Sequence, residues 1–193
     1  MRRMFWVFVL LIAALAVVLT GCARQTPPEE AEADGGVHND TSYDAPKTIA
    51  STLIIAFRCD FSAYDRVEED TRLAGRAYRL EARLENGAVK GSYYAYTPFD
   101  GEKKLFRASH SFMTGLQKVV AEHDLARHNG LSYRVSGLPE DYGATLSVTY
   151  ASGESIHASH NQDCFLSIDA MEALEALFRS QAEPRPTAGK RDQ

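Results

Sequence analysis

The sequence predicts an α+β fold in which a predominantly antiparallel sheet of five to seven strands carries two helices on one face. Three observations predict it. Apolar and polar residues alternate over several short runs between residues 53 and 158, which is the period of a half-buried strand. Asn86-Gly87 separates two of these runs and is a strong hairpin signal. Two further runs repeat apolar residues at intervals of three and four, as amphipathic helices do.

Alternation of apolar and polar side chains defines the expected strands. They cover residues 53–62, 78–85, 89–96, 104–109, 146–150 and 156–158. In the first strand the apolar positions include Cys59, so this side chain should point into the core. Turn signals precede two of the later strands: Asp100-Gly101 comes before the fourth and Ser152-Gly153 before the last.

The first helix is expected where Phe112, Leu116, Val120 and their neighbours recur at helical spacing. Ser111 is placed to cap its start, and Asn129-Gly130 is placed to close its end.

The second helix contains four apolar residues at helical spacing between 171 and 178. Its start is capped either by a capping box formed by Asp169 and Glu172 or by Ser167. The two helices and the sheet should share one core, which is expected to contain Phe57, Leu80, Leu84, Phe112, Leu116, Val148, Ile156, Leu174 and Phe178.

The two halves of this region share an order of elements. A strand, a Gly-Glu turn, a second strand, the triplet Ala-Ser-His and a helix follow one another twice, with the triplets at residues 108–110 and 158–160. This order predicts a ββα pseudo-repeat, and a chance match of the triplet is the alternative.

The first residues of the chain have the pattern of a secretion signal. Two arginines precede an apolar run over residues 5–19, and Leu19-Thr20-Gly21-Cys22 ends it. This pattern resembles the lipobox of bacterial lipoprotein signal peptides. The resemblance implies that residues 1–21 are cleaved, that Cys22 receives a diacylglyceryl group, and that its new amino terminus is acylated. The alternatives are an uncleaved anchor, although a run of 15 residues is short of the roughly 20 that span a bilayer, or an ordinary signal peptide.

A lipoprotein of this kind lies outside the cytoplasm and is bound to a membrane through the lipid on Cys22. Ala23 stands where an Asp retains many such proteins at the inner membrane of enteric bacteria. The outer membrane is therefore expected if the host has one, and otherwise the outer face of the cell membrane. The region from Glu122 to Gln162 is also similar to a broad group of uncharacterised bacterial lipoproteins, and this resemblance transfers no active residues.

Composition divides the rest of the chain. Residues 22–46 begin with the lipidated Cys and are rich in Pro, Gly and acidic residues, which predicts a disordered tether. Residues 183–193 predict a disordered tail. Residues 47–182 have the length and the apolar content of a single α+β domain.

Charge and aromatic content limit the partners. The chain has a net charge of −5, and removal of two signal-peptide arginines leaves −7 in the mature protein. No basic cluster is visible in the sequence, so nucleic acid is not expected as a partner, whereas envelope proteins or peptides are. The single Trp, Trp6, lies in the signal peptide, which weakens a carbohydrate-binding interpretation, although Tyr can replace Trp in that role.

Two cysteines remain after lipidation of Cys22. Cys59 and Cys164 would form a disulfide in an oxidising compartment, or they would be two buried thiols. The sequence leaves both interpretations open.

Histidines are the main candidates for chemistry. His157 and His160 lie three apart on an expected strand and so point to opposite faces, whereas a zinc pair needs one face. His110 would meet His160 only if the pseudo-repeat sets the two strand ends side by side. The acidic run Glu68-Glu69-Asp70 lacks the spacing of a calcium loop, and no nucleotide-binding or zinc-protease motif appears. We therefore expect no metal and no other cofactor.

Tyr94 and Tyr96 are a candidate binding surface. They share the strand face opposite to Tyr93, and this face would meet solvent if helices cover only one side of the sheet. The alternative is that they pack under the segment 131–143.

Two functions remain. The first is a lipid-anchored, non-enzymatic binding module of the cell envelope, favoured by the absence of catalytic motifs and by the long tether. The alternative is a metal-dependent or other hydrolase that uses His110, His157 or His160.

Replacing Cys22 by Ser tests the lipid anchor. Cys22→Ser removes the thiol that would carry the diacylglyceryl group, so the protein should no longer partition into the detergent phase. Detergent-phase extraction followed by immunoblotting measures this. If the variant partitions like wild type by any means other than an uncleaved segment 5–19, the lipobox interpretation is wrong.

Overall fold

The computed structural model describes residues 36–38, 44–64, 73–97, 99–135 and 142–183. The predicted signal peptide, Cys22, most of the predicted tether, the run Glu68-Glu69-Asp70 and nearly all of the predicted tail lie outside these ranges. Within them, the helices are too short or too polar to cross a membrane.

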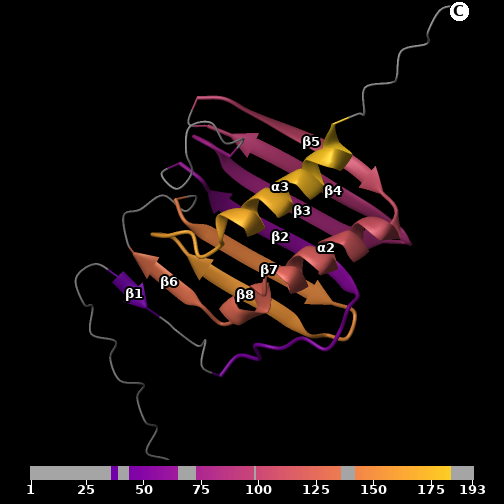
Figure 1. Ribbon diagram of the computed structural model, residues 1–193, viewed down its shortest axis with the longest axis horizontal. Helices are drawn as coiled ribbons and strands as arrows, with labels where there is room; N and C mark the ends of the chain where they lie inside the picture. Colours follow the sequence, from indigo (N-terminus) through magenta and orange to yellow (C-terminus); the bar gives the residue numbers. More distant parts are fainter. Residues whose placement is uncertain (1–35, 39–43, 65–72, 98, 136–141, 184–193) are drawn as a thin grey trace, which may run out of the picture. The chain divides into compact units, whose positions relative to one another are not determined.

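One sheet and two α-helices make up the described part of the chain (Figure 1). In chain order the elements are β1 (Gly36–His38), β2 (Ile54–Ser62), β3 (Ala77–Glu85), β4 (Ala88–Tyr96), β5 (Gly101–Ala108), α2 (His110–Glu122), the 3-10 helix η1 (Leu125–His128), β6 (Ser132–Val135), β7 (Ala144–Tyr150), β8 (Ser155–His160) and α3 (Ile168–Ala182).

The strand order across the sheet is β1-β6-β8-β7-β2-β3-β4-β5. All neighbours pair antiparallel except β6 and β8, which pair parallel. Both α-helices lie against the same face of the sheet (Figure 1). The predicted α+β fold is thus confirmed: among the described residues the sheet has seven strands of four or more residues, plus the three-residue β1.

The core lies between the helices and the sheet. The nine predicted core residues belong to a single cluster; eight of them are buried and Leu84 packs against the others from a partly buried position. Phe178 of α3 is central, because its ring lies 5.1 Å from that of Phe112 on α2 and 5.8 Å from that of Phe57 on β2. Aromatic contacts therefore join both helices to the middle of the sheet.

The ends of the first helix differ from the prediction. The extended residue Ser109, not Ser111, precedes the first helical residue, and the two hydroxyls bond each other at 2.7 Å. The helix ends at Glu122, because Asp124 adopts a left-handed conformation with φ +48°, which an α-helix cannot continue. A 3-10 turn then leads to Gly130, so the predicted Asn129-Gly130 stop closes η1 instead.

The second helix starts as one of the two alternatives predicted. Ser167 is its N-cap, and the Ser167 hydroxyl accepts the backbone N–H of Ala170 at 3.2 Å. Asp169 lies in the first turn, where a negative charge suits the helix dipole.

The predicted ββα order occurs twice, as β4-β5-α2 and β7-β8-α3. In both copies the Ala of the triplet, Ala108 or Ala158, lies on the side of the sheet that carries the helices. The following residues differ, because Ser109 is already the N-cap of α2 whereas Ser159 and His160 extend β8.

Two buried asparagines attach the outer strands. The side-chain amide of Asn161 bonds the backbone of Val135 as a neighbouring strand would. It accepts the N–H of Val135 and donates to the carbonyl of Val135, both at 2.8 Å. Asn129 accepts the N–H of His157 at 2.9 Å and donates to the carbonyl of Pro46 at 3.0 Å. These bonds fix β6 beside β8 and hold the start of the domain against the sheet.

A buried carboxylate links α3 to β4. Glu175 is only 5 % exposed, and one of its oxygens accepts the Tyr93 hydroxyl and the Arg179 Nε–H, each at 2.9 Å. Burial, followed by the neighbouring Glu175, raises the pKa of Tyr93, so this hydroxyl stays protonated and keeps its role as a donor.

Truncation of Leu174 tests the packing of α3. This side chain is fully buried, so Leu174→Ala leaves a cavity and should lower the free energy of unfolding by roughly 2–5 kcal/mol. Urea denaturation followed by circular dichroism measures the loss. A change below about 0.5 kcal/mol would show that the helix does not pack as described.

Candidate functional site

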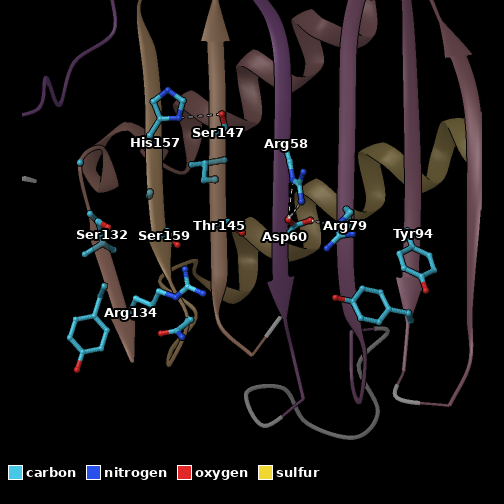
Figure 2. A pocket seen from close by; sticks show the side chains of 17 residues that line it. Arg58, Asp60, Arg79, Tyr94, Ser132, Arg134, Thr145, Ser147, His157 and Ser159 are labelled. Carbon is cyan, nitrogen blue, oxygen red and sulfur yellow. Dashed lines mark hydrogen bonds and ion pairs between the residues drawn. The ribbon is translucent and has the colours of Figure 1, made fainter. Parts of the chain in front are cut away.

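The sheet face opposite the helices carries the candidate site. Among the described elements no helix covers this face, and alternate residues of β6, β8, β7, β2, β3 and β4 project from it (Figure 2). A groove of about 790 Å³ crosses it from β6 to β4, and we call this groove the trough. This volume is within the range of small-molecule binding sites and is larger than that of a packing defect.

Strand register assembles the trough from distant parts of the chain. One row of directly paired residues, here called the trough row, crosses six strands at right angles. From β6 to β4 it contains Ser132, Ser159, Thr145, Asp60, Arg79 and Tyr94. Figure 2 shows these side chains on one face, with the helices behind the sheet. With strands about 4.8 Å apart, the row is roughly 24 Å long.

An ionic cluster occupies the middle of the trough. Asp60 accepts two bonds from Arg58, through Nε at 3.0 Å and Nη2 at 2.9 Å, and one from Arg79 Nε at 2.9 Å. The Asp60 side chain is 13 % exposed, whereas those of Arg58 and Arg79 are 51 % and 40 % exposed. The hydrogen bond to Asp60 is the main reason that the pKa of Arg79 is raised. One carboxylate therefore orients two cations. Arg58 also lies 3.7 Å from Glu81, which in turn lies 3.7 Å from Lys103, so with these two residues included the cluster has three cations and two carboxylates.

Hydroxyl groups line the trough on the other side of Asp60. Ser132, Ser159 and Thr145 are consecutive members of the trough row, and within the described residues none of their hydroxyls bonds another side chain. In the next row Ser147 Oγ lies 3.2 Å from His157 Nδ1. The three hydroxyls of the trough row are thus available to a ligand or to water.

The two candidate tyrosines lie on this uncovered face and line the trough. The rings of Tyr94 and Tyr96 stack with centroids 4.7 Å apart and an interplanar angle of 16°. Of the segment expected to cover them, residues 131–135 and 142–143 are described. Residues 131–135 contain β6, which β8, β7, β2 and β3 separate from β4, and residues 142–143 lead into β7 beside the end of β2, where the Gly143 carbonyl accepts the N–H of Ser62 at 3.0 Å. Binding by the two tyrosines stays a prediction.

The uncovered face is basic although the chain is acidic. At its outward positions the strands β2–β8 carry the basic residues Arg58, Arg79, Arg83, Lys90, Lys103, Arg107 and Arg134 and the acidic residues Asp60, Glu81 and Glu85. Arg83, Lys90 and Arg107 face one another directly on three neighbouring strands, and Lys90 forms an ion pair with Glu85 at 2.6 Å. Directly opposed like charges repel, so this row attracts anions.

Sequence reasoning found no basic cluster, because these residues never stand side by side in the chain. The alternating pattern places Arg58, Asp60 and Arg79 on the polar side of their strands. This pattern indicates the face on which they lie, but not that they meet. Their assembly requires the pairing of β2 with both β3 and β7, which alternation alone does not specify.

The candidate histidines are dispersed. His157 lines the trough, His110 begins α2 after β5, and His160 ends β8, with four strands between β5 and β8. His160 Nδ1 accepts the backbone N–H groups of Gln162 and Asp163 at 3.3 and 2.9 Å. The order of the strands keeps His110 and His160 apart, and the described residues contain no cluster of three or more metal-binding side chains.

Both candidate disulfide residues, Cys59 and Cys164, are buried in the structure. Burial raises the pKa of the Cys59 thiol, and the nearby Cys164 raises it further. The Cys164 thiol contacts the sulfur of Met171 at 3.7 Å. The two cysteines are thus close enough to affect each other, and their pairing stays a prediction.

Comparison with known proteins gives no relative: no model of a protein family matches the sequence, and neither a curated protein nor a solved structure matches the chain.

Charge reversal of Arg107 tests the repulsive row. Arg107→Glu places an opposite charge beside Lys90 and should raise the free energy of unfolding by roughly 0.2–1 kcal/mol at low salt. Arg107→Gln removes the repulsion without adding an attraction, so it should give a smaller gain. Urea denaturation at low and high salt measures both. Equal or lower stability of Arg107→Glu would contradict the description of this row.

Proposed function

We propose that the protein is a lipid-anchored, non-enzymatic binding module of the cell envelope, and that the trough binds an anionic ligand. The membrane would hold the protein through the lipid on Cys22. The proposed tether of residues 22–46 would have a typical reach of roughly 25–30 Å, which lets the trough meet soluble and surface-bound molecules.

The Arg58–Asp60–Arg79 cluster is the observation that carries this proposal. Asp60 engages Arg79 only through Nε, so the two Nη groups at the outer end of the guanidinium can receive a ligand. Because Asp60 already orients both guanidinium groups, a bound anion would cost little side-chain entropy. The surrounding basic face would raise the rate of encounter with anions.

The geometry supports binding more than hydrolysis. Ser147 and His157 form a contact that resembles a nucleophile and its base. However, both residues lie within paired strands, where backbone N–H groups bond across the sheet and do not converge on one point as an oxyanion hole does. The hydrolase alternative using His110, His157 or His160 thus has one supporting contact, and His110 and His160 do not join it.

Binding of two soluble polyanions tests the proposal. The probes are polygalacturonate and polyglutamate, titrated calorimetrically into the full lipidated protein in non-ionic detergent. We expect binding that weakens with salt, and a loss of about 10-fold or more with Arg79→Ala, since hydrogen bonds to charged groups contribute about 1.5–3 kcal/mol.

Lys118→Ala is the matched control, because Lys118 is an exposed cation on α2, at the opposite side of the sheet. It changes the net charge equally and should bind like wild type. The proposal is wrong if wild type binds neither probe, or if the two variants lose affinity equally.

A further inference from the structure

We infer that the ligand of the trough is an acidic saccharide, that is, a chain of sugar rings bearing carboxylates. This inference rests on the proposed function and narrows it to one class of anion. Three features of the trough row carry it: the hydroxyls of Ser132, Ser159 and Thr145, the oriented guanidinium of Arg79 and the adjacent ring of Tyr94.

The hydroxyls match a polyhydroxylated ligand. Ser132, Ser159 and Thr145 follow one another at the strand spacing of about 4.8 Å, and each hydroxyl both donates and accepts. Sugar hydroxyls have the same dual capacity, so either partner can be the donor at each position. Because these groups lie along one line, they fit an extended ligand that runs across the strands better than they fit a compact anion.

Arg79 supplies the site for the carboxylate. Its Nε–H is committed to Asp60 at 2.9 Å, so its remaining edge offers two parallel N–H groups, from Nη1 and Nη2. A planar carboxylate accepts such a pair in bidentate fashion, which a flexible ammonium cannot reproduce. In this arrangement Asp60 is a positioning residue, because it acts on the ligand through Arg79.

Tyr94 lies directly opposite Arg79 on β4 and borders the trough. An aromatic ring beside a cation can contact the C–H face of a sugar ring whose carboxylate reaches the cation. Trp is the usual residue for stacking against sugar rings, but the mature chain contains none. Tyr94, with its stacked neighbour Tyr96, would provide that aromatic surface instead.

A peptide ligand fits the trough less well. Extended peptides usually bind a sheet through main-chain hydrogen bonds along an exposed edge strand. The trough instead crosses six strands whose backbone groups already pair with one another, so a peptide main chain would meet side chains only.

Three matched probes separate the possibilities in calorimetric titrations of the full lipidated protein in non-ionic detergent. Trigalacturonate has rings, hydroxyls and carboxylates; its methyl ester keeps the rings and hydroxyls but removes the charges; triglutamate keeps carboxylates without sugar hydroxyls. We expect trigalacturonate to bind at least 10-fold more tightly than either of the others.

Two pairs of variants assign the contacts. Thr145→Val removes one hydroxyl at nearly constant shape and should weaken trigalacturonate binding about 2- to 10-fold without changing triglutamate binding. Thr149→Val is its control, since Thr149 lies on the same strand and face but outside the trough. Arg79→Lys should weaken both acidic probes, whereas Arg83→Lys, outside the trough, should not.

The outcomes distinguish the two proposals. If triglutamate binds as tightly as trigalacturonate, or if Thr145→Val binds trigalacturonate like wild type, the saccharide inference is wrong while anion binding by the trough stands. If trigalacturonate and its methyl ester bind equally, or if no acidic probe binds, the inference and the proposed function both fall. Circular dichroism of each variant confirms that the fold is intact.

Discussion

Antiparallel register at the centre of the sheet is the constraint on which the rest of the structure depends. Cys59 pairs with Leu80 on one side and with Leu146 on the other, which places three apolar side chains on the helix-covered face. The same register sets Asp60 between Arg79 and Thr145 on the uncovered face. A slip of one residue would exchange the two faces, so the core and the trough are specified together.

The hydrophobic core and the ionic cluster therefore support each other. Burial of the apolar face against α2 and α3 fixes the register, and the register then brings three charged residues into contact without any loop to position them. Sites on strands hold their side chains more rigidly than sites on loops do. This rigidity favours binding, because Arg58 and Arg79 lose their side-chain entropy when the protein folds and not when the ligand binds.

Local patterns in the sequence predicted most of the fold but little of the site. The Asn86-Gly87 hairpin and Leu174 in the core depend on nearby residues and on burial, and the structure confirms both. The end of α2 was missed, because the left-handed conformation of Asp124 has no apolar signature. The trough was also missed, because Asp60 meets Thr145 across 85 positions of chain, and strand order is not encoded in alternation.

The placement of charge on this fold is itself an argument for recognition. An acidic chain that only needed solubility would gain nothing from collecting its cations on one sheet face, where Arg83, Lys90 and Arg107 repel one another. Such an arrangement lowers the stability of the fold, so another constraint must retain it. Residues at functional sites commonly lower stability in this way. A bound anion would relieve the repulsion. The same face carries the trough, with its oriented guanidinium groups and its row of hydroxyls, so one explanation, a bound anion, accounts for both the unfavourable charges and the groups that can accept a ligand.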